Sequence, residues 1–149
     1  MLEASGAIDV KRISERYFEA WRRRDPDAIV ALHSEDGTFR THLDMEPVEG
    51  REAIRATFAD LFERLPELSF ETYRVLHGSD FWILDWALIF RPQGTDETQR
   101  FDCLDVVNVS PDGLVVRKET FVDMVQMQAA IPQLDEQLAE ATEQAEVTA

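Results

Sequence analysis

Residues 81–90 read Phe-Trp-Ile-Leu-Asp-Trp-Ala-Leu-Ile-Phe, and this stretch decides the fold. Alternation along a strand divides it into two apolar faces. One face holds Trp82, Leu84, Trp86, Leu88 and Phe90, and the other holds Phe81, Ile83, Ala87 and Ile89. Asp85 interrupts the run, which is also well short of the roughly 18 apolar residues that a membrane helix needs. The stretch therefore predicts a strand that is covered on both sides.

Further strands are predicted on both sides of this one in the sequence. Residues 68–77, 100–109 and 114–125 are rich in β-branched and aromatic residues, and turn signals containing glycine separate them. These spacings are typical of an antiparallel meander. Residues 38–43 also alternate, with Phe39, Thr41 and Leu43 on one face and Arg40 and His42 on the other.

Helices are predicted to precede the meander. Residues 8–24 carry Val10, Ile13, Tyr17 and Trp21 at helical spacing. Asp25-Pro26 starts a short second helix that carries His33 and stops near Gly37, and a third helix with a strong apolar stripe runs from Gly50 to Pro66. Helices followed by strands indicate an α+β domain with helices on one face of a curved sheet. We assign residues 1–131 to this domain and residues 132–149 to an acidic C-terminal tail or short helix.

Composition narrows the range of partners. The formal net charge is −15, and an acidic surface repels phosphate backbones and anionic lipids, so we expect no nucleic-acid and no membrane partner. The single cysteine, Cys103, and the lack of a signal-peptide pattern favour a cytoplasmic protein. The second apolar face of residues 81–90 predicts a homodimer that covers Phe81, Ile83, Ala87 and Ile89.

One carboxylate is predicted on the face of the sheet that packs against the helices. Asp105 alternates in phase with Phe101, Cys103, Val107 and Val109, so it faces the helices. Burial of an unpaired carboxyl group favours its protonated form, which donates a hydrogen bond. The alternative is that a backbone amide or an arginine satisfies Asp105. Tyr17, on the buried stripe of the first helix, either finds a hydrogen-bond partner or places its tip at the surface. The histidines have no metal-ligand spacing, and we expect no metal and no cofactor.

The chain resembles the nuclear transport factor 2-like superfamily, and within it the ketosteroid isomerase and SnoaL-like polyketide cyclase groups. The resemblance extends from the first helix to the last strand and rests on residues 16–21, 25–32, 35–39, 50–55, 104–107 and 112–116. It implies a cone-shaped barrel in which a curved antiparallel sheet wraps around the helices, as in cystatin-like rolls. By resemblance to ketosteroid isomerase, Tyr17 and Asp105 fall at the positions of its two oxyanion donors.

The resemblance departs from the isomerase at the general base, where this chain has Thr41. Threonine does not remove a proton from carbon at neutral pH, and the adjacent His42 alternates to the opposite face. Limonene epoxide hydrolase shares the fold and uses an Arg-x-Asp pair on a middle strand. The matching strand here carries Asp85 without that arginine, so we set its reaction aside.

Two hypotheses for function remain open. In the first, an apolar cavity holds a small hydrophobic molecule, and Tyr17 and Asp105 donate hydrogen bonds to its carbonyl or enol oxygen during an isomerisation, cyclisation or dehydration. In the second, the same cavity binds a ligand without turnover, or the domain is a dimeric interaction module. The predicted ligand-binding residues are Trp21, Phe39, Thr41, Phe58, Phe62, Trp86, Leu88, Phe90, Cys103 and Phe121.

Overall fold

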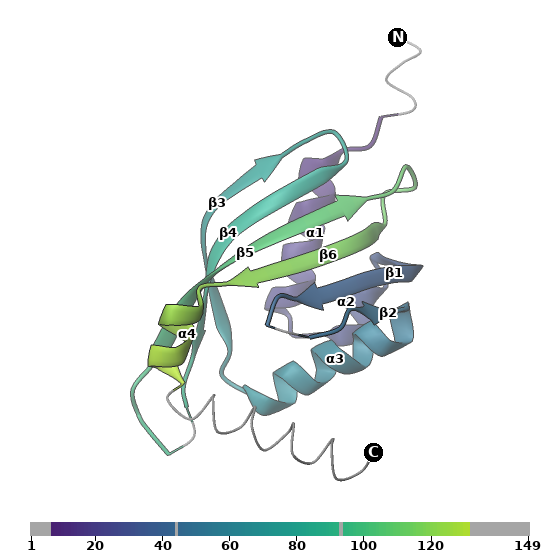
Figure 1. The fold of residues 1–149 in the computed structure, drawn as a ribbon. Helices are drawn as coiled ribbons and strands as arrows, with labels where there is room; N and C mark the ends of the chain where they lie inside the picture. Colours follow the sequence, from purple (N-terminus) through teal and green to yellow (C-terminus); the bar gives the residue numbers. More distant parts are fainter. Residues whose placement is uncertain (1–6, 44, 93, 132–149) are drawn as a thin grey trace.

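The computed structural model describes residues 7–43, 45–92 and 94–131. The described residues form α1 (Val10–Arg22), α2 (Pro26–Val30), β1 (His33–Thr41), β2 (Val48–Glu49), α3 (Arg51–Arg64), β3 (Ser69–His77), β4 (Phe81–Phe90), β5 (Gln99–Val109), β6 (Val115–Val122) and α4 (Met124–Ala130). The predicted tail at residues 132–149 lies outside this description. Helices α1, α2 and α3 lie on one side of a strongly curved sheet, and α4 follows β6 at its end (Figure 1).

The sheet has the strand order β2-β1-β6-β5-β4-β3. Strands β3 to β6 form the predicted antiparallel meander, and Trp86 of β4 lies opposite Cys103 of β5. The predicted α+β fold, a curved and mainly antiparallel sheet wrapped around helices, is confirmed, and the structure adds two features to it. Strand β1 pairs with β6 in parallel, and the sheet stays open, with β2 at one edge and β3 at the other.

Strand β1 begins five residues before the predicted alternating stretch. His33 already pairs with Val115, and the register shifts between His33 and Thr38. The intervening Glu-Asp-Gly sequence is typical of a turn, but here it forms an irregular part of a strand. The Gly37 carbonyl accepts a hydrogen bond from the Gly50 amide at 2.8 Å, so β1 also fixes the start of α3. His33 therefore belongs to the sheet and not to the end of the second helix.

Aspartate caps set where the helices begin. The side chain of Asp9 accepts a hydrogen bond from the Arg12 amide, and that of Asp25 accepts one from the Ala28 amide. Pro26 follows Asp25 at the first helical position, where its missing N–H leaves no partner unsatisfied. These caps fix α1 with Tyr17 buried against the sheet. Among the described residues, no helix is long and apolar enough to cross a membrane.

The outer face of the sheet is only partly apolar. Ala87 is fully buried, whereas Phe81, Ile83 and Ile89 are half-buried. Ala87 lies opposite Glu71 and Asp102, and long polar side chains link these neighbours across the face, including contacts of Arg100 with Glu71 and of Tyr73 with Asp102. Ala87 is thus buried within one chain, and its burial does not depend on the predicted partner chain. The most exposed apolar side chains of this face are Tyr73, Leu76, Leu104 and Phe121.

Candidate functional site: an apolar cavity with a buried ion pair

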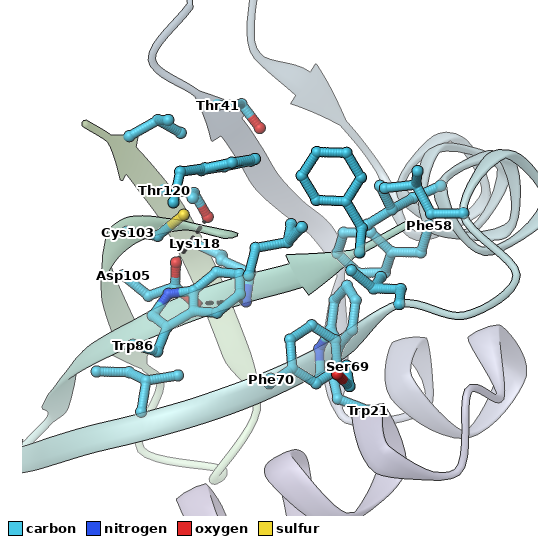
Figure 2. Close-up of a pocket in the computed structure, with 18 of the residues that line it drawn as sticks. Trp21, Thr41, Phe58, Ser69, Phe70, Trp86, Cys103, Asp105, Lys118 and Thr120 are labelled. Atoms are coloured by element: carbon cyan, nitrogen blue, oxygen red, sulfur yellow. Dashed lines mark hydrogen bonds and ion pairs between the residues drawn. The ribbon is translucent and has the colours of Figure 1, made fainter. Parts of the chain in front are cut away.

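A cavity of about 580 Å³ is lined by residues of the helices and of the sheet. Its wall is mainly aromatic and aliphatic, with Trp21, Phe58, Phe70 and Trp86 among the lining residues (Figure 2). A cavity of this size and lining is typical of sites that hold small organic molecules. Its polar groups are few, so each of them is informative.

Most of the predicted site residues lie in the cavity wall. These are Tyr17, Trp21, Phe39, Thr41, Phe58, Trp86, Leu88, Phe90, Cys103 and Asp105. Phe62 is instead a core residue that packs against Trp21 with ring centroids 5.3 Å apart. The placement of Phe121 in the cavity was wrong. It lies opposite Leu104 on the outer face, is 41% exposed and stacks on His42, because the register turns Lys118 and Thr120 inward.

Asp105 faces inward as predicted, but it is not unpaired. Lys118 Nζ lies 3.0 Å from its Oδ2, and Thr120 Oγ1 donates to its Oδ1 at 2.8 Å. All three side chains are buried and meet at one point of the wall (Figure 2). Both carboxylate oxygens therefore have donors, so the premise of an unpaired, protonated acid does not hold. Of the alternatives considered from the sequence, a satisfied Asp105 is the one found, with lysine in the place of arginine.

Lys118 is the buried cation of the cavity. Its Nζ lies 5.0 Å from the ring centroids of both Tyr17 and Trp21, within the range of cation–π attraction. Burial acts to lower the pKa of Lys118, but Asp105 and Tyr17 more than offset it, and the pKa is raised. Lys118 therefore stays an ammonium group. Asp105 Oδ2 takes one of its three N–H groups, which leaves donor capacity for a ligand oxygen.

Tyr17 finds its partner in His33. Its hydroxyl lies 2.8 Å from His33 Nε2, and both side chains are buried. Burial, with Lys118 and Arg51 as further causes, lowers the pKa of His33 to about 3, so the ring is neutral. Burial also raises the pKa of Tyr17, which keeps the phenol protonated. The Tyr17 hydroxyl is thus hydrogen-bonded within the protein, and Lys118 Nζ lies near both the Tyr17 ring and the Asp105 carboxylate.

Thr41 and His42, which fall at and next to the position of the isomerase's general base, lie on opposite sides of the sheet, as strand alternation predicts. Thr41 lines the cavity, whereas His42 points to the outer face and bonds Glu119 at 2.6 Å. Burial raises the pKa of the Cys103 thiol to about 12, so Cys103 is an inert part of the wall. The carboxylates among the described lining residues are Asp105 and Asp60, and Asp60 pairs with Arg64 at 2.9 Å. Within the described ranges, no three His, Cys, Asp or Glu side chains form a metal-binding group.

Lys118 is the residue that sequence reasoning missed. It lies on the strand expected at residues 114–125 and is one of only two lysines in a chain whose other basic residues are arginine. A buried aspartate requires a donor, and alternation from an inward Lys118 would also have put Phe121 outside. The register of β5 against β6, which shifts at Asn108/Val109, sets this phase.

Comparison with solved structures places the fold among known ones. The chain is similar to the epoxide hydrolase/cyclase-like enzyme SalBIII of pyran ring formation in salinomycin, with 22% identity, a TM-score of 0.69 and coverage of 78% of this chain and 92% of that one. It is also similar to a putative SnoaL-like polyketide cyclase from Jannaschia sp., with 19% identity, a TM-score of 0.70 and coverage of 81% and 92%.

A third similar structure is a hypothetical protein from Catenulispora acidiphila with a ketosteroid isomerase-like fold, in complex with trimethylamine. It has 15% identity, a TM-score of 0.70 and coverage of 79% of this chain and 90% of that one. At these identities the likeness concerns the fold alone, which is that of the nuclear transport factor 2-like superfamily. No curated protein matches the chain. The model of the SnoaL-like domain matches residues 14–118, which span α1 to β6, and the chain therefore belongs to the SnoaL-like domain family.

Proposed function

We propose that this domain binds a small, largely apolar molecule in its cavity and holds one oxygen of that molecule with Lys118. The observation that carries this proposal is a single buried ammonium group, paired with Asp105, in the wall of an otherwise aromatic cavity. An apolar wall contributes binding affinity but does not fix how the ligand is oriented. A well-placed polar group fixes that orientation. Membership of the SnoaL-like family supports a small-molecule role.

The ammonium group is a better candidate for the ligand contact than the two donors expected from the sequence. Tyr17 is bonded to His33, and Asp105 accepts hydrogen bonds from Lys118 and Thr120. Lys118 retains N–H groups beyond the one that Asp105 accepts. A hydrogen bond from a charged donor is worth roughly 1.5–3 kcal/mol, or about ten- to a hundredfold in affinity.

Binding is tested with a matched pair of probes, 2-acetylnaphthalene and 2-ethylnaphthalene, which differ by the carbonyl oxygen. Amide NMR spectra of the protein report the dissociation constant of each and the residues that move. We expect the ketone to bind about tenfold more tightly than the hydrocarbon, with shifts centred on the cavity wall. Lys118→Met should remove this preference. Lys11→Met, which alters the other, exposed lysine, should keep it.

Two results would contradict the binding proposal. One is equal affinity of the native protein for ketone and hydrocarbon, and the other is a set of shifts outside the cavity wall. Circular dichroism first establishes that Lys118→Met is folded. If it is not, the double variant Asp105→Leu/Lys118→Met replaces the pair with apolar side chains and is used in its place.

A second candidate function is enolate chemistry, and the position of Asp105 beside Lys118 favours it. In that reaction the C–H bond next to a ligand carbonyl breaks, its proton passes to the Asp105 carboxylate, and the electron pair moves onto the carbonyl oxygen. Lys118 then stabilises the resulting enolate. Such an enolate is the common intermediate of the isomerisation, cyclisation and dehydration reactions considered above.

Hydrogen–deuterium exchange tests this chemistry without knowledge of the substrate. The methyl protons of 2-acetylnaphthalene in D₂O should exchange faster with the native protein than with buffer, and Asp105→Asn should lose most of that acceleration. Exchange at the buffer rate, together with normal ketone binding, would leave the domain as a binding module.

A further inference from the structure

The buried charged groups of the cavity cancel one another. Lys118 contributes +1 and Asp105 contributes −1, their charged atoms are 3.0 Å apart, and both side chains are more than nine-tenths buried. Burial and the charges of Lys118 and Arg51 keep the neighbouring His33 neutral, and Tyr17 stays a neutral phenol. The deep polar group of the cavity is therefore neutral as a whole.

The other charged residues of the described cavity wall already have hydrogen-bond partners within the protein. Arg22 bonds Glu19 and Arg64 bonds Asp60. Arg24 has no carboxylate partner among the described residues, but its guanidinium donates to the backbone carbonyls of Leu65 and Leu68 at 2.8 and 2.6 Å. None of these three donates to the group formed by Asp105, Lys118 and Thr120.

From this balance we infer that Asp105 acts as a charge filter, so that the cavity accepts neutral ligands with a carbonyl, ether or hydroxyl oxygen and rejects carboxylates of the same shape. The inference rests on the proposed function, because it concerns the ligand that Lys118 holds. Cation sites in proteins ordinarily select anions. Here the cation is already neutralised, so a second anion would leave a net buried charge of −1 in an apolar cavity, which is strongly unfavourable.

A neutral oxygen incurs no such penalty. It accepts a hydrogen bond from the ammonium group while Asp105 keeps its own contact, and the total charge of the site does not change. Asp105 also has lone pairs beyond those used by Lys118 and Thr120, because each carboxylate oxygen accepts more than one hydrogen bond. A hydroxyl next to the ligand's carbonyl therefore finds an acceptor at the same place. Hydroxyketones and enols satisfy both groups at once.

The experiment compares two ligands of nearly equal size, the neutral ketone 2-acetylnaphthalene and the carboxylate 2-naphthoate, by amide NMR titration at neutral pH. The native protein should bind the ketone at least about tenfold more tightly. Asp105→Asn should reverse this order, because Lys118 then lacks its carboxylate and 2-naphthoate supplies one. Asp85→Asn, which removes a carboxylate on the outer face of the sheet, should retain the native order.

The outcomes separate this inference from the proposed function. If the native protein binds neither compound in the cavity, the proposed function fails. If it binds 2-naphthoate as tightly as the ketone, or if Asp105→Asn leaves the order unchanged, the charge filter fails while the binding function stands.

A measurement on the native protein keeps the test valid if Asp105→Asn does not fold. Calorimetry in two buffers with different ionisation enthalpies reports protons taken up on binding. Any 2-naphthoate that enters the native cavity should bring about one proton with it, which preserves the neutral balance. Binding without proton uptake would overturn the inference.

Discussion

At the scale of single residues, the cavity depends on a buried ion pair whose energetic role is unlike that of a surface salt bridge. The Asp105 carboxylate and the Lys118 ammonium group have both lost their hydration, and their attraction has to offset that loss. Removal of one partner leaves a bare charge in an apolar wall. Replacement of both removes the desolvation penalty together with the attraction.

The first prediction follows from this asymmetry. Lys118→Met and Asp105→Leu should each lower the free energy of unfolding by about 3–5 kcal/mol, and the double variant should lose much less than their sum. Urea denaturation of the four proteins in a double-mutant cycle measures the coupling. Additive losses would mean that the two groups do not interact in the folded protein.

The second prediction concerns His33, whose pKa falls from the usual 6.5 to about 3 on folding. Between these two values the unfolded chain binds the proton and the folded chain does not. His33 thus contributes stability that is complete above about pH 6.5 and is lost as the pH falls toward 3. The slope should approach ~1.4 kcal/mol per pH unit from this group.

Urea denaturation between pH 7 and pH 4.5 measures that slope. In His33→Gln the dependence of unfolding free energy on pH should be shallower by about one proton, because carboxylates contribute equally to both proteins. His77→Gln, at a second histidine that bonds Ser14, serves as the control. Parallel curves for the native protein and His33→Gln would exclude a neutral buried His33.

The directions of the buried polar side chains were predictable from the sequence, but their partners were not. The inward direction of Tyr17 and Asp105 was predictable, because helical spacing and strand alternation each set a side chain's direction locally. Their partners were not, since Lys118 and His33 come from other strands, and the register between strands decides which side chains meet. Phe121 was misplaced for the same reason, by a one-residue error in phase along β6.

At the scale of elements, a clamp from Arg24 joins the end of α1 to the end of α3. Arg24 lies just after α1 with a φ of 55°, and its guanidinium donates to the carbonyls of Phe62, Leu65 and Leu68. These carbonyls belong to the end of α3 and the turn into β3, where helix and turn leave acceptors without intrahelical donors. The clamp therefore holds the segment in which Leu65, Leu68 and Ser69 line the cavity.

The third prediction tests the clamp. Arg24→Ala should lower the free energy of unfolding by about 2–3 kcal/mol, because it removes the hydrogen bonds that the guanidinium donates to the Phe62, Leu65 and Leu68 carbonyls. Arg24→Gly should be less destabilising than Arg24→Ala by about 1 kcal/mol, because glycine adopts a positive φ without strain. Chemical denaturation measures both, with the exposed neighbour in Arg23→Ala as the control. A loss in Arg23→Ala as large as that in Arg24→Ala would contradict the clamp.

The elements themselves were predictable where one local pattern decides them. The caps at Asp25-Pro26, the stripe of α3 and the alternation of β4 all correspond to elements of the structure. The sequence did not reveal the parallel pairing of β1 with β6, because the two strands are far apart in the chain. The early start of β1 was not predictable either, because Glu35-Asp36-Gly37 has the composition of a turn. In the structure these three residues belong to the strand.

At the scale of the whole molecule, the open sheet has an outer face that α1, α2 and α3 do not cover. Tyr73, Leu76, Leu104 and Phe121 are exposed on it, while Asp85 pairs with Arg74 and Glu119 pairs with His42. The face thus combines exposed apolar side chains with polar groups that already have partners within the chain, as interfaces with an apolar centre and a polar rim do. The predicted homodimer remains the simplest cover for it, now centred on Leu104 and Phe121 rather than on Ala87.

The fourth prediction is that the chain forms a dimer at micromolar concentration through this face, and that salt strengthens the dimer. Each chain carries a formal charge of −15, so two chains repel, and screening at ~0.5 M NaCl shortens the range of that repulsion to less than a typical interface width. Sedimentation equilibrium should give a dissociation constant that falls as NaCl rises from 50 to ~500 mM.

Leu104→Glu should shift the protein to monomer without loss of ligand binding, because Leu104 lies on the outer face and the cavity on the inner one. Glu63→Gln on the exposed side of α3 should leave the dimer intact, since α3 lies on the opposite side of the sheet. If the native protein sediments as a monomer at every salt concentration, the outer face is a wet surface. If it sediments as a dimer that Leu104→Glu does not disturb, the interface lies elsewhere on the molecule.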